Sequence, residues 1–313
     1  MPRSPRHKSQ HSTFYHLLNR VAGAPGYFPF NRRSVAHKFL ALFEFYLRLY
    51  YCRLASFELM GNHYHCVVHF DEFRWLDRDE LQRRARLRFG RRWKLRAHHW
   101  SQSDWDQFNH DLFDVSKFMQ HVNGEFSKWF NRRYGRRGHF WADRFKNPEL
   151  LDTQAVQNTI LYSELNAVRA GLVKRPEDYK MGSAHWRWAG KKTDLLMPLE
   201  ELFPGQMGQD AFTIYRTLLY YHGAVATTEK QVVIPNSIVQ QEKNRGFSRE
   251  GLFRRRLRFF TDGVALGSRQ EVRVLLEKYR GQGLYKRRIN PIPQLGGPLF
   301  SLREQRSHAF APG

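Results

Sequence analysis

The feature that most constrains the fold is an alternating apolar stretch, YYCRLASFELMGNHYHCVVHF, at residues 50–70. It is rich in aromatic and β-branched residues, and Gly61 with the asparagine after it interrupts the pattern, which is typical of two strands joined by a tight turn. Successive side chains of a strand point to opposite faces, so His63 and His65 share one face and Tyr64 lies on the other. The stretch therefore predicts a β-hairpin that presents two histidines on one side of a sheet.

The rest of the chain predicts an α+β domain around this hairpin. A first strand is expected at residues 14–21. Apolar residues then recur at helical spacing in several stretches, which lie at 34–49, 114–134, 152–171, 209–222 and 248–261. Asp152 is expected to cap the third of these helices, and Gly171 to end it. This order of elements favours a central antiparallel sheet with packed helices, followed by a mainly helical C-terminal region.

The domain organisation follows from changes in composition along the chain. Residues 1–12 are expected to form a flexible basic tail, and residues 13–188 the main domain. A basic insertion occupies residues 71–110, and residues 189–313 form a C-terminal accessory region in which no chemical motif is evident.

The charge of the chain points to a polyanionic partner. Lysine and arginine number 52 against 29 acidic residues, which gives a formal net charge of +23. Such an excess attracts nucleic acid, and the 15% aromatic content suits stacking on bases, although a core rich in phenylalanine accounts for much of it.

Two basic segments are candidates for the contact with DNA. The first has no acidic residue and comprises Arg83, Arg84, Arg86, Arg88, Arg91, Arg92, Lys94 and Arg96. Eight like charges repel one another unless an anion lies nearby. Binding of the phosphate backbone by this segment is therefore favoured over a solvated helix face. The second, RRYGRRGHFWADRFK, is punctuated by glycines and contributes Arg132, Arg133, Arg136, Arg137 and Arg144.

The cysteines and the hydropathy favour a cytoplasmic protein, for which a bacterial, nucleoid-associated location is the expectation that goes with DNA as the partner. Cys52 and Cys66 are the two cysteines of the chain, so no disulfide framework is expected. No apolar run approaches the length of about 18 residues that a membrane span needs, and the basic N-terminus lacks a signal core.

The paired histidines are a candidate metal site. Two imidazoles on one face of a strand are close enough to bind one ion between them. By itself, the pattern is more often a structural or surface pair.

Tyr162 is the candidate nucleophile. Its helix has a buried stripe of apolar residues, and Asn158, Tyr162 and Asn166 follow one another at intervals of four on a neighbouring face. The tyrosine hydroxyl and the amide of Asn166 could thus reach the same metal ion. A half-buried packing role is the alternative, because spacing alone does not choose among 14 tyrosines.

Three stretches, MGNHYHCVVHF, GHFWADRFK and YSELNAVRAGLVKRPEDY, resemble in order and spacing the motifs of the REP-associated tyrosine transposases. These belong to the single-tyrosine HUH transposases and nucleases. The similarity covers roughly residues 12–188. It implies a ferredoxin-like or RRM-like sheet with the histidines on a central strand and the tyrosine helix packed across it.

The resemblance also implies the roles of individual residues. His63 and His65 match the metal-binding pair, Tyr162 matches the nucleophile, and Asn166 matches a third ligand. Magnesium or manganese is the implied metal, although imidazole ligands by themselves favour zinc. Proline is usual in the family at two positions where this chain has Gly61 and Ala167. Neither change removes a reacting group.

The implied function is cutting and rejoining of single-stranded DNA at hairpin-forming repeats, through a 5′-phosphotyrosine intermediate. The expected partner is single-stranded or hairpin DNA, with no membrane and no small-molecule substrate, and the protein acts as a monomer or a homodimer. Two alternatives remain. One is a domesticated or inactive hairpin-binding protein. The other is a zinc hydrolase, which no HExxH motif or further Cys/His cluster supports.

Overall fold

One mixed sheet forms the centre of the protein. The structure is a computed structural model that describes residues 9, 11–191, 194–205, 208–224, 232–243, 263–282, 290–291 and 300–303. Within these residues the strand order is β2-β3-β1-β4-β5-β7-β6. All neighbouring strands are antiparallel except β4 and β5, which are parallel. The strands are β1 (Thr13–Arg20), β2 (Cys52–Leu59), β3 (His63–Phe70), β4 (Glu149–Leu150), β5 (Gly263–Gly267), β6 (Asn290–Pro291) and β7 (Phe300–Arg303).

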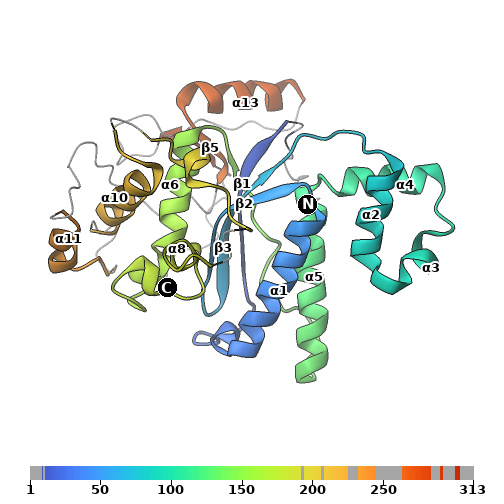
Figure 1. The fold of residues 1–313 in the computed structure, drawn as a ribbon, viewed down its shortest axis with the longest axis horizontal. Helices are drawn as coiled ribbons and strands as arrows, with labels where there is room; N and C mark the ends of the chain where they lie inside the picture. Colours follow the sequence, from blue (N-terminus) through green and yellow to red (C-terminus); the bar gives the residue numbers. More distant parts are fainter. Residues whose placement is uncertain are drawn as a thin grey trace.

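The predicted α+β fold is confirmed. Along the chain, β1, α1 (Arg33–Leu49), β2, β3, α5 (Val115–Tyr134) and β4 follow one another as in the βαββαβ ferredoxin-like arrangement. In Figure 1, α1 and α5 lie on one face of the sheet, and α6 (Thr153–Glu164) lies on the other. The basic insertion forms α2 (Arg78–Phe89), α3 (Trp93–Ala97) and α4 (Gln102–Asp111), which project beyond α1 and α5. Among the described residues, every helix is too short or too polar to span a bilayer.

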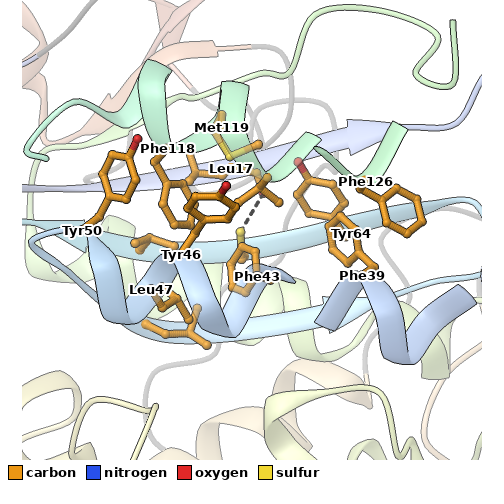
Figure 2. Close-up of a cluster of buried hydrophobic side chains, with 14 of the residues drawn as sticks. Leu17, Phe39, Phe43, Tyr46, Leu47, Tyr50, Tyr64, Phe118, Met119 and Phe126 are labelled. Carbon is orange, nitrogen blue, oxygen red and sulfur yellow. Dashed lines mark hydrogen bonds between the residues drawn. The ribbon is translucent and has the colours of Figure 1, made fainter. Parts of the chain in front are cut away.

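The face of the sheet toward α1 and α5 is packed with aromatic rings. Figure 2 shows Tyr64 of β3 among side chains from both helices. Its ring centroid lies 5.0 Å from that of Phe39 on α1, and Phe43 on the same helix lies 5.6 Å from Phe118 on α5. Offset and edge-to-face ring pairs of this kind add to the free energy of apolar burial. Much of the aromatic content of the chain therefore belongs to the core.

The helix predicted from residue 152 to Gly171 is wrong in one respect, because it breaks in the middle. Asp152 caps α6 as expected, by accepting a hydrogen bond from the backbone N–H of Ala155 at 2.7 Å. However, α6 ends at Glu164, and a short helix, α7 (Asn166–Arg169), follows. The break has a local cause. The side chain of Asn166 donates to the carbonyl of Ser163, and the N–H of Ala167, which would bond that carbonyl in a continuous helix, donates to Glu58 instead.

The C-terminal region contains the helix expected at residues 209–222, and it also extends the sheet. The described helices there are α9 (Leu199–Leu202), α10 (Ala211–Gly223), α11 (Asn236–Lys243) and α13 (Arg269–Gly281). Strands β5, β7 and β6 were not predicted, and β5 pairs with β4 of the main domain. The helix expected at residues 248–261 lies outside the described residues. The domain boundary at residue 188 stays a prediction.

Part of the first basic segment has a structural role. Arg84 is buried, and its guanidinium donates to Glu80 and to the carbonyls of Arg48 and Leu49 at the end of α1. Arg83 pairs with the same glutamate. Arg88 pairs with Glu125 of α5, whereas Arg86, Arg91 and Arg92 are exposed. DNA contact by this segment stays a prediction, and the exposed members are the ones available for it.

The division of the segment predicts unequal effects on stability. Arg84→Ala should lower the free energy of unfolding by about 2–3 kcal/mol, because it leaves two helix-end carbonyls without this donor and removes one of the partners of Glu80. Arg91→Ala, on the exposed side, should change it by less than about 0.5 kcal/mol. Urea denaturation of both variants measures the difference, and equal effects would contradict the structural role of Arg84.

Candidate functional site

The face of the sheet opposite the aromatic core carries a row of histidines. In the antiparallel pairing of β1 with β3, Leu18 lies opposite His65 and Arg20 opposite His63, so the even-numbered residues of β1 share the histidine face. His16 is one of them. It is fully buried, its Nε2 atom lies 2.9 Å from Nδ1 of His65, and the two rings stack at a centroid distance of 5.1 Å. The ring centroids of His63 and His65 are 5.3 Å apart.

Tyr162, on the helix that covers the histidine face, completes this cluster. Helix α6 packs on β2 and β3. The ring of Tyr162 stands edge-on to that of His65 at 5.6 Å and to that of His16 at 6.1 Å. The structure thus brings together three residues that the sequence analysis singled out, His63, His65 and Tyr162, and it adds His16. Tyr162 is 7% exposed.

The two histidines that are predicted metal ligands are neutral imidazoles at neutral pH. Burial lowers the pKa of His63 to about 4, and Arg20 adds to this effect. Burial also holds the pKa of His65 well below its usual range, with further contributions from His16 and His63. A neutral imidazole nitrogen keeps the lone pair that metal binding requires.

The hydrogen-bond partners of the two histidines fit a metal site, because each Nδ1 atom has a neighbour and each Nε2 atom remains for an ion. Nδ1 of His63 lies 2.8 Å from Oδ1 of Asn62, and Nδ1 of His65 faces His16. When each Nδ1 carries the proton, each Nε2 is left as a ligand, an arrangement common around protein-bound metals. Across the described residues, no group of three or more His, Cys, Asp or Glu could hold an ion. A bound metal would therefore take its remaining ligands from other groups.

Asn166, the predicted third ligand, is placed by the helix break. Its Nδ2 atom donates to the carbonyl of Ser163 at 3.1 Å, and the residue is half-buried. Its role as a ligand stays a prediction.

A buried carboxyl group connects β2, the strand next to the histidines, to the broken helix. Glu58 lies opposite His65 in the pairing of β2 with β3. Its Oε1 atom accepts a hydrogen bond from the N–H of Ala167 at 2.6 Å. Burial raises the pKa of Glu58 well above its usual value, while this hydrogen bond lowers it.

A cation from the same broken helix lies over the nucleophile candidate. The guanidinium carbon of Arg169 lies 5.4 Å from the ring centroid of Tyr162. Burial lowers the pKa of Arg169, and the proximity of Tyr162 and Glu58 opposes this shift.

The second basic segment lies at the His63 end of the sheet. Ala142 donates its N–H to the carbonyl of Arg20, the residue opposite His63. Arg136 donates to the hydroxyl of Tyr27 and stacks on its ring. The remaining predicted DNA contacts in this segment are exposed, and they are Arg132, Arg133, Arg137 and Arg144. Their contact with DNA stays a prediction.

Comparison with known proteins gave only a distant likeness among solved structures. No family model matches the chain, and no curated protein matches its sequence. A solved structure of a REP-associated tyrosine transposase bound to a REP hairpin is similar, with a TM-score of 0.40 and 13% identity, over 63% of this chain and 89% of that chain. Because this likeness is so distant, the function proposed below rests on the residues of the chain itself.

Three residues of the cluster were not singled out from the sequence: His16, Glu58 and Arg169. His16 and Glu58 each stand between two apolar residues of a strand. A polar residue on the buried face of a predicted strand can be noticed in the sequence. The strand register that brings each of these two residues beside His65 is decided only when the strands pair.

The link between Glu58 and Ala167 makes a testable prediction. Ala167→Pro removes the N–H donor and should lower the free energy of unfolding by about 1–3 kcal/mol, because a buried carboxyl group loses its partner. Glu58→Met removes the acceptor, and its effect should be smaller in the Ala167→Pro background than alone. A double-mutant cycle from denaturation curves measures this coupling. Strictly additive effects would mean that the hydrogen bond contributes nothing.

Proposed function

We propose that this protein cuts and rejoins single-stranded DNA, with Tyr162 as the nucleophile and His63 and His65 as metal ligands. The observation that carries the proposal is the meeting of these three rings on one face of the sheet. The ring centroids of His63 and His65 lie 5.3 Å apart, and those of His65 and Tyr162 lie 5.6 Å apart. They come from segments about a hundred residues apart in the chain. The resemblance of the sequence motifs to the single-tyrosine transposases supports the same roles.

The residues of the site account for the chemistry. The oxygen of Tyr162 bonds to phosphorus, the bond from phosphorus to the 3′ oxygen breaks, and the tyrosine proton is balanced by protonation of the 3′ oxygen. The products are a 5′-phosphotyrosine and a free 3′-hydroxyl. Because the phosphoester bond is conserved, a second 3′-hydroxyl reverses the step and joins strands without ATP.

A divalent cation, magnesium or manganese, held by His63 and His65 would polarise the scissile phosphate and offset its developing charge. Asn166 is the protein group proposed as a further ligand. Arg20, opposite His63 on β1, supplies positive charge beside the pair.

DNA is held in this proposal by the exposed arginines near the site. The segment from Arg132 to Arg144 runs past the His63 end of the sheet, and its cations neutralise phosphates without reading sequence. Tyr27 and Phe28 lie in the same region, and Phe28 is 47% exposed. An exposed ring beside basic side chains suits stacking on an unpaired base.

One observation favours the alternative, a hairpin-binding protein that does not cut. Tyr162 is 7% exposed, and a nucleophile must reach its phosphate. In this alternative the tyrosine packs between α6 and the histidine face, and the basic surface alone contacts DNA. The two functions differ in whether a covalent protein–DNA species forms.

The nucleophile prediction tests this difference. Tyr162→Phe removes one oxygen and keeps the ring, so the melting temperature should move little. Cleavage of a single-stranded hairpin oligonucleotide and the covalent adduct should both vanish, because phenylalanine cannot form a phosphoester. Tyr134→Phe is the matched control. Tyr134 ends α5, packs on Phe130 and stacks with Arg32, and its loss should leave cleavage intact. Peptide mapping that places the adduct on Tyr134 would overturn the assignment.

The metal prediction uses a control from the same strand. His63→Ala and His65→Ala should each abolish cleavage while leaving binding of the hairpin oligonucleotide within about threefold, because the basic surface is untouched. His69→Ala changes a histidine of the same face of β3 that bonds Ser12 instead, and it should keep both activities. Titration with manganese, followed by calorimetry, should show binding to the unaltered protein and to His69→Ala only. Equal loss of DNA binding and cleavage in the first two variants would indicate a structural pair.

A further inference from the structure

Arg169 has an unused donor beside the proposed nucleophile. Its guanidinium carbon lies 5.4 Å from the ring centroid of Tyr162. The Nη1 atom is buried and has no hydrogen-bond partner among the described residues. Buried donors of folded proteins almost always have a partner, and each exception calls for an explanation such as a missing ligand.

A second arginine, Arg187, uses both terminal nitrogens of its guanidinium, although its Nε is buried without a partner among the described residues. Arg187 also stacks over a tyrosine, with its guanidinium carbon 5.7 Å from the ring centroid of Tyr215. Its Nη1 donates to the carbonyl of Met197 at 3.2 Å, and its Nη2 to the carbonyl of Ala55 at 2.7 Å. Both terminal nitrogens thus fix neighbouring backbone. Arg169 has a similar position over a ring, but its Nη1 donates no hydrogen bond to a described residue.

Glu58, the acidic group that acts on Arg169, does not hydrogen-bond to it. Glu58 interacts with Arg169 electrostatically, but its Oε1 accepts from Ala167, and Arg169 forms no ion pair with a described residue. A guanidinium is always protonated and cannot act as a base. Placing such a charge in a buried site without a counterion is costly, so the site favours an anion that arrives with the substrate.

We propose that Arg169 is a phosphate-binding residue of the site, whose Nη1 donates to a non-bridging oxygen of the phosphate that Tyr162 attacks. The inference rests on the proposed function. As the tyrosine oxygen bonds to phosphorus and the bond to the 3′ oxygen breaks, negative charge stays on the non-bridging oxygens. A fixed cation beside the tyrosine stabilises that charge, and the same contact holds the 5′-phosphotyrosine until a 3′-hydroxyl returns.

The first experiment measures phosphate binding without catalysis. Mixed-sequence 12-nucleotide single strands, with a 5′-phosphate or a 5′-hydroxyl and a 3′ fluorophore, are titrated with Tyr162→Phe protein in EDTA. The Kd for the phosphorylated strand should be about tenfold lower. Adding Arg169→Met should reduce this preference to less than about twofold, whereas adding Arg53→Met, a surface arginine paired with Glu201, should leave it unchanged. Arg169→Gln serves in the same way if the methionine variant unfolds. A tenfold preference that survives in either folded variant overturns the proposal.

The second experiment measures the rate of adduct formation at saturating hairpin oligonucleotide, with manganese present. Arg169→Met should slow it by about a hundredfold with an unchanged melting temperature, and millimolar methylguanidinium should restore part of the rate. An adduct formed at the unaltered rate overturns the role of Arg169. If the unaltered protein forms no adduct yet prefers the 5′-phosphate through Arg169, the proposed strand transfer fails and the phosphate site stands.

Discussion

The register between β1 and β3 is the constraint on which the rest of the site depends. Side chains alternate between the two faces of a strand, so a slip of one residue would place His65 in the aromatic core and Tyr64 under α6. The packing of Tyr64 against Phe39 and the hydrogen bond from its hydroxyl to Asn123 oppose such a slip, because both are lost when the ring leaves the core. Core packing on one face thus fixes the positions of His16, His63 and His65 on the other.

The broken helix is held in place by carboxyl groups from two directions. Glu58 of β2 accepts from the start of α7, which fixes the break against the strand next to the histidines. Glu164, at the end of α6, accepts from the hydroxyls of Ser183 and Tyr215 at 2.5 Å each. Tyr215 belongs to α10, so the C-terminal region helps to hold the helix that carries Tyr162. Fully hydrogen-bonded buried networks of this kind specify one arrangement of the elements they join.

The site is largely buried, and arginine side chains lie near its histidines and its tyrosine. Burial lowers the pKa of His63 and of His65, Arg20 lies near both histidines, and Arg169 lies over the ring of Tyr162. In such surroundings each charge acts through a low dielectric, and a phosphate experiences stronger attraction than it would at a solvated surface. The exposed arginines of the second basic segment lie at the His63 end of the same sheet. Their long-range attraction therefore draws a nucleic acid toward the end of the sheet that carries the site.

The sequence by itself determined the local features of this protein. Alternation predicted the hairpin and the shared face of His63 and His65, and helical periodicity predicted the helix of Tyr162, because both patterns reflect geometry within one segment. Only the tertiary structure decided which segments meet. It placed His16 against His65, turned the backbone at Asn166 through the contact of Ala167 with Glu58, and left Arg169 over Tyr162. Strand register and side-chain contacts across elements depend on how whole surfaces pack, and no spacing within a single segment encodes that.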